Sequence, residues 1–95
     1  MPSYLVETYL ARGRAGERTA CEGRARLAAA ELTRERTCVR FDRSIHMLED
    51  EICFFVFDAS SGPDAALAAR RAGLDPLRVV EAISSDQSTD DIEGA

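Results

Sequence analysis

The segment Glu51–Ala59 has the sequence EICFFVFDA and predicts a β-strand with apolar side chains on both faces. Successive side chains of a strand point to opposite faces of a sheet, so the apolar residues of this segment divide into two sets. One set is Ile52, Phe54 and Val56, and the other is Cys53, Phe55 and Phe57. Because both sets are apolar, we expect both faces of this strand to be covered.

The preceding segment, Cys38–Leu48, predicts a second strand because apolar and polar residues alternate along it. The alternation assigns Val39, Phe41, Ile45 and Met47 to one face, and Arg40, Asp42, Ser44 and His46 to the other. Arg43 is the one residue that breaks the pattern. Asp50 and Glu51 border a turn, so the two strands are expected to pair as an antiparallel hairpin.

A strand and a helix are predicted before this hairpin. Ser3–Leu10 is rich in aromatic and β-branched residues and ends at a glycine-punctuated turn. From Gly16 to about Arg36, apolar residues recur with a period near 3.6, which is typical of an amphipathic helix. The apolar stripe of this helix consists of Cys21, Ala25, Ala28, Ala29 and Leu32.

A second helix and a last strand are predicted after the hairpin. The sequence SSG at 60–62 offers N-cap residues, and Pro63 occupies the first helical position. Gly73 suits the left-handed position that follows a helix, so the helix is expected to span about Pro63–Ala72. The segment Leu77–Ile83 predicts the fourth and last strand.

The order β-α-β-β-α-β predicts a ferredoxin-like α+β fold, also called an α-β plait, for residues 1–83. Such a fold has a four-stranded antiparallel sheet with both helices on one face. Residues 84–95, SSDQSTDDIEGA, are polar and acidic, and they are expected to form a tail without a fold of its own.

Two helices on one face leave the other face of the sheet without cover from either helix. Leaving Ile52, Phe54 and Val56 in water would forgo about 1.5–3 kcal/mol each. A second copy of the chain is the simplest cover, which predicts a homodimeric α+β barrel with a pocket between the two sheets. The alternative is a monomer whose tail folds across the sheet.

Charge and composition exclude several classes of protein. Twelve basic and seventeen acidic residues give a net charge of −5, and four of the acids lie within residues 86–95. An acidic chain lacks the basic footprint that nucleic-acid binding requires. No apolar run approaches the roughly 20 residues of a membrane-spanning helix, and no secretory signal begins the chain, so a cytoplasmic location is expected. The three cysteines form no CxxC pair, which argues against disulfides and zinc ribbons.

Two carboxylates interrupt apolar strands and are candidates for a buried binding site. Glu7 shares a predicted face with Leu5 and Tyr9, and Glu81 lies between Val80 and Ala82. We therefore take Glu7, Tyr9 and Glu81 as candidate ligand-binding residues. The alternative is that these acids are exposed or paired with an arginine, for which Arg43 and Arg78 are the candidates.

His46 is the single histidine, so each chain could supply only one imidazole to a metal. It is a candidate metal ligand together with Glu7, with simple solvent exposure beside the turn as the alternative. Cys53 lies within the most apolar strand, where a thiol is expected to stay protonated and inert. No catalytic residue is assigned.

The chain resembles a bacterial family of small ferredoxin-like proteins known as a domain of unknown function, one branch of which is described as nickel-binding. The resemblance covers about residues 3–83 and rests on Tyr4–Glu7 with Tyr9, Cys53–Ala59, Ala68–Leu74 and Arg78–Glu81. It implies a ferredoxin-like fold and a homodimer. At the positions that correspond to the histidines of the nickel-binding branch, this sequence has Glu7, Ala68 and Ala72.

Three hypotheses about function follow. The first is a homodimeric binding protein that holds a small molecule, or weakly a divalent metal such as nickel, between its sheets. The second is a small α+β-barrel enzyme of the isomerase, cyclase or cofactor-free oxygenase type. The third is a protein-interaction module without a cavity.

Overall fold

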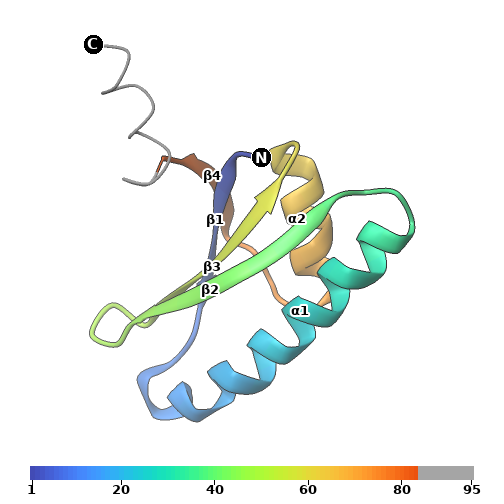
Figure 1. The fold of residues 1–95 in the computed structure, drawn as a ribbon. Helices are drawn as coiled ribbons and strands as arrows, with labels where there is room; N and C mark the ends of the chain where they lie inside the picture. Colours follow the sequence, from blue (N-terminus) through green and yellow to red (C-terminus); the bar gives the residue numbers. More distant parts are fainter. Residues whose placement is uncertain (84–95) are drawn as a thin grey trace.

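The computed structural model describes residues 1–83, which form a four-stranded sheet and two α-helices in the predicted order (Figure 1). The strands are β1 (Ser3–Tyr9), β2 (Val39–Met47), β3 (Ile52–Ala59) and β4 (Arg78–Ala82). The helices are α1 (Arg18–Arg34) and α2 (Gly62–Arg71), and a 3₁₀ helix that the sequence did not predict, η1 (Arg12–Glu17), precedes α1. The predicted tail, 84–95, lies outside the described residues.

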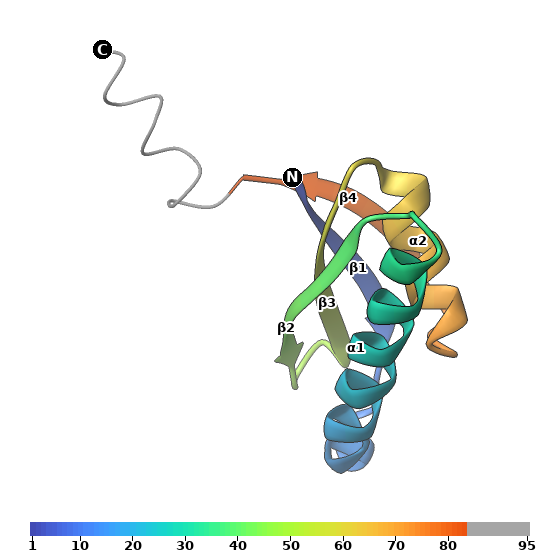
Figure 2. The same cartoon turned by 45° about the vertical axis from the view of Figure 1, so that its right-hand side comes forward.

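The sheet has the strand order β2-β3-β1-β4, and each neighbouring pair is antiparallel. Both helices pack against the same face of it, as Figure 2 shows. This arrangement confirms the ferredoxin-like α+β fold.

The helix-covered side of the sheet forms the core, with large side chains from the strands against small ones from the helices. Val6, Cys53, Phe55 and Phe57 are almost fully buried on the sheet side. The helices contribute Leu32 and a series of buried alanines, which are Ala25, Ala28 and Ala29 of α1 and Ala65, Ala68 and Ala69 of α2. Alanines allow both helices to approach the sheet closely enough to pack around its aromatic rings.

Local signals fix the ends of α2 where they were predicted. The Ser61 side chain accepts a hydrogen bond from the Asp64 amide (3.3 Å), and Pro63 lies in the first turn. At the other end, Gly73 adopts φ +80°, and the Leu74 amide donates to the Ala69 carbonyl. This is the left-handed ending that glycine favours.

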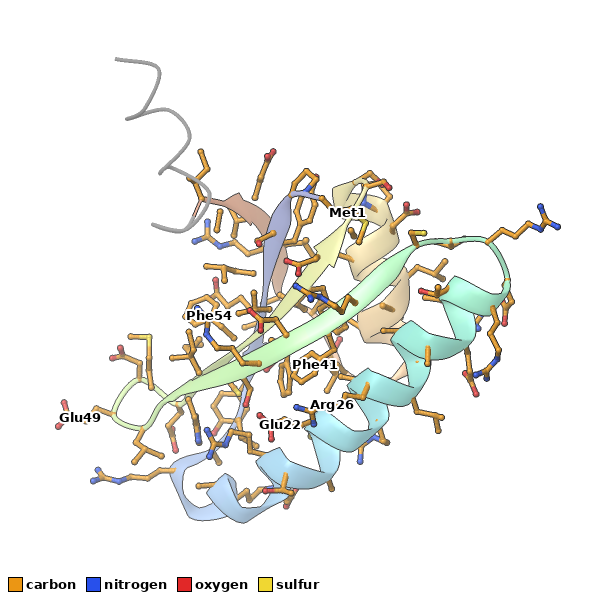
Figure 3. All side chains as sticks on the ribbon, viewed as in Figure 1. Met1, Glu22, Arg26, Phe41, Glu49 and Phe54 are labelled. Carbon is orange, nitrogen blue, oxygen red and sulfur yellow. The ribbon has the colours of Figure 1, made fainter. Side chains whose placement is uncertain are left out.

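One sequence prediction about β2 was wrong. Phe41 pairs with Phe57 and Arg43 with Val56, so Asp42 is an extra residue that forms a β-bulge. Beyond the bulge the side chains exchange faces: Ile45 and Met47 do not share the face of Val39 and Phe41, and Ser44 and His46 do not share the face of Arg40. Figure 3 shows Phe41 between β2 and α1, with Phe54 on the other side of β2.

Candidate functional site

The candidate site is the open face, by which we mean the side of the sheet that faces away from α1 and α2. Directly opposed residues of neighbouring strands share a face, so the strand register identifies its members. One row across the sheet consists of Arg43, Val56, Leu5 and Val80, the next of Ile45, Phe54, Glu7 and Arg78, and the last of Met47, Ile52 and Tyr9. No helix of the described chain covers these residues (Figure 2).

The open face is apolar at its centre and exposed toward one edge and one end. Val56 is buried, and Phe54 is half-buried. In contrast, Ile45 and Met47 on the edge strand are each 43% exposed, and Tyr9 is 58% exposed. An apolar face with partly exposed large side chains is the kind of surface that marks an interaction site.

Glu7 lies within this apolar face and is paired with Arg78. The Arg78 Nε donates to the Glu7 Oε1 over 2.8 Å, and the two residues oppose each other on β1 and β4. The Glu7 side chain is 20% exposed, while that of Arg78 is 68% exposed. Of the two arginines considered as partners, the register therefore selects Arg78 and places Arg43 opposite Val56.

A second polar group on the open face was not predicted from the sequence. The Asp58 carboxylate accepts a hydrogen bond from the Ser3 hydroxyl (2.8 Å) and further bonds from the Arg40 guanidinium. Its side chain is only 12% exposed. The hydrogen bond that Arg40 donates to the Asp58 carboxylate raises the pKa of Arg40 above its ordinary value. The bulge at Asp42 sets the pairing of Arg40 with Asp58, so a count back from the hairpin turn would give a different partner.

The sheet separates the residues that the sequence grouped into one site. Glu7 and Tyr9 belong to the open face, but Glu81 opposes Tyr4, a core residue, and is exposed on the helix side of β4. His46 opposes Cys53 on the helix side, where its Nε2 donates to the Leu10 carbonyl (2.9 Å). Within one chain, Glu81 therefore does not join Glu7.

The residues of the described chain do not fit a nickel site. Glu7 and His46 lie on opposite faces of the sheet, and Glu7 is already bound by Arg78. Ala68 and Ala72 carry no donor atoms and are buried in the core. Among residues 1–83, no group of three or more His, Cys, Asp or Glu side chains is arranged to hold a metal ion.

Comparison of the chain with protein-family models, with curated proteins and with solved structures found no match. Within the described residues, neither helix has the length and apolar character needed to cross a membrane.

Proposed function

We propose that the protein is a homodimeric binding protein in which two open faces meet and enclose a small polar molecule. The observation that carries this proposal is that both helices pack on one side of the sheet, so that within residues 1–83 no element covers the other side, with Phe54, Ile45 and Met47. The free energy falls when apolar side chains leave water, so binding of a partner to this face is favoured.

A second copy is a better partner for this face than residues 84–95. That segment contains one large apolar residue, Ile92, and four acids, so it has little apolar surface to offer. A second copy brings the same apolar rows, which match each other about a two-fold axis.

The size of the face is compatible with a dimer. Four strands spaced by about 4.8 Å, with seven residues of β1 at about 3.4 Å each, give a flat area of roughly 450 Å² per copy. The two copies together approach the ~1,000 Å² expected of a specific interface, and the uneven surface of the side chains adds to this flat estimate.

The polar groups of the open face favour a ligand over a fully packed interface. Dimerisation would bring two copies of the Glu7–Arg78 pair and two copies of the Asp58–Arg40–Ser3 group between the sheets. Ion pairs removed from water lose hydration that their mutual attraction only partly restores. A polar molecule between the sheets would supply hydrogen bonds to these groups. Arg78 also donates a hydrogen bond to Glu7, so Glu7 is less available than a free carboxylate as the general base of an enzyme.

Native mass spectrometry of the full-length protein, purified gently from its host, tests the proposal. We expect the mass of two chains plus a retained small molecule. Glu7→Ala should keep the dimer and lose the molecule, because the substitution removes the carboxylate that faces the interior. Glu49→Ala, in the exposed β2–β3 turn (Figure 3), is the matched control and should keep both.

Two results would contradict the proposal. A single chain at high protein concentration would refute the dimer. A dimer that retains no small molecule, or one that Glu7→Ala leaves unchanged in its ligand content, would refute the binding site and favour the interaction module.

A further inference from the structure

A cavity of about 290 Å³ lies on the helix side of the sheet, opposite the open face. It forms because the two helices differ in length: α1 has 17 residues and spans about 25 Å, while α2 has 10 and spans about 15 Å. The first turns of α1 therefore continue past the end of α2, as Figures 1 and 2 show. The helix η1 and the loop from Gly73 to Leu77 border the space that remains.

The inner wall of this cavity is apolar. Leu10 and Phe55, both core residues, line it from the sheet, and Leu74 lines it from the α2–β4 loop. Leu10 and Phe55 are buried and Leu74 is half-buried. This wall suits an aliphatic or aromatic group, and the cavity volume is at the lower end of the range for small-molecule sites.

The two arginines that line the cavity differ in their partners. Arg14 donates two hydrogen bonds of 2.8 Å to Glu17, so the Glu17 carboxylate balances the charge of Arg14. Arg24 instead donates from Nε to the Ala72 carbonyl (2.8 Å) and from Nη2 to the Cys21 sulfur (3.3 Å). Within the described residues no carboxylate oxygen lies within 4.0 Å of the Arg24 guanidinium.

We propose that this cavity binds a small organic carboxylate with an apolar body. The carboxylate would bind the Arg24 guanidinium, and the body would lie against Leu10, Phe55 and Leu74. Guanidinium and carboxylate are well matched in geometry and charge. The bond to the Ala72 carbonyl holds Arg24 in place, which reduces the entropy lost on binding. Glu17 and Asp75 also line the cavity, but both are exposed, so water and salt screen their repulsion of a bound carboxylate.

Thiol alkylation of the full chain tests this proposal, with Cys21 on the cavity wall as the reporter. The probe is 3-phenylpropanoate, and the reagent is iodoacetamide with the modified sites mapped by mass spectrometry. We expect the probe to slow alkylation of Cys21 at least threefold. Cys38 is exposed and does not line the cavity, so it should react at an unchanged rate and serve as the control within the same molecule.

The neutral amide 3-phenylpropanamide has nearly the same shape and should give no protection, because it lacks the charge that Arg24 would bind. Arg24→Gln should also abolish protection, while Arg34→Gln, an exposed arginine in the last turn of α1, should not. Circular dichroism checks that both variants are folded. Equal protection by acid and amide, equal protection of Cys38, or no protection of Cys21 in the unaltered chain would each overturn the proposal.

Discussion

Cys53 shows what burial does to a single ionisable group. Its side chain is fully buried in β3, and this burial raises the pKa of the thiol to about 11 because the thiolate would lose its hydration. The thiol is therefore protonated at neutral pH, as its place in an apolar strand predicted. It belongs to the core and has no part in either proposed site.

The stability of the protein should fall as the pH rises from about 9 to about 11. In the unfolded chain Cys53 ionises near its ordinary pKa of 9.0, whereas the folded chain keeps the proton until about 11. The unfolded state therefore binds fewer protons in this range, which favours unfolding by up to about 2 kcal/mol. Urea unfolding at pH 8 and pH 10.5 measures the loss. Cys53→Ala should lower stability at both pH values but show a smaller decline between them, and an equal decline would contradict the assignment.

The partner of Glu7 illustrates how far a residue's role could be predicted. The sequence showed that Glu7 interrupts an apolar face and named Arg43 and Arg78 as possible partners. Only the register of β1 with β4 distinguishes them, because it places Arg78 directly opposite Glu7. Register depends on contacts between residues about 70 positions apart, which a local pattern does not contain.

The strands and helices were predicted to within a few residues because their signals are local. The capped start of α2, the left-handed Gly73 and the apolar stripe of α1 all lie where the sequence placed them. The face of each residue in β2 beyond Asp42 could not be predicted in the same way. The bulge at Asp42 is a shift in the pairing of β2 with β3, so it depends on the partner strand as well as on the sequence of β2.

Two glycines, one just beyond the end of α2 and one inside α1, should respond oppositely to replacement by alanine. Gly73 has φ +80°, so Gly73→Ala should destabilise the protein by about 1–2 kcal/mol. Gly23 lies inside α1, where an added Cβ would have no atom within 4 Å, so Gly23→Ala should stabilise it by about 0.5–1 kcal/mol. Urea denaturation measures both changes, and changes of the same sign would show that backbone conformation does not control these positions.

The proposed dimer predicts how the assembled protein responds to a charge on either side of the sheet. Ile45→Glu places a charge on the open face and should convert dimers to monomers. Leu27→Glu places the same charge on an exposed apolar residue of α1, 59% exposed, and should leave the dimer intact. Sedimentation velocity measures the mass. In addition, the melting temperature should rise with protein concentration for the unaltered protein and for Leu27→Glu alone. A dimer that tolerates Ile45→Glu would require another interface.

The sequence predicted the fold and the uncovered face, but not the details of either candidate site. The uncovered face follows from a strand that is apolar on both sides beside only two helices. The Asp58–Arg40–Ser3 group depends on the bulge, and the helix-side cavity depends on the unequal lengths of α1 and α2 together with the path of the loop between α2 and β4. Such features arise where elements meet, so they are absent from the pattern of any single element.

The extra residue in β2 allows one alternating sequence to supply both sides of the sheet. Val39 and Phe41 enter the core, while Ile45 and Met47 lie on the open face because Asp42 is left out of the register with β3. In a regular strand of the same length, Ile45 and Met47 would point toward the helices, and Ser44 and His46 would point outward. Deletion of Asp42 would instead leave Arg43 opposite Val56, so each remaining residue of β2 would keep its present face. The apolar character of the outer surface therefore depends on where a single residue leaves the ladder.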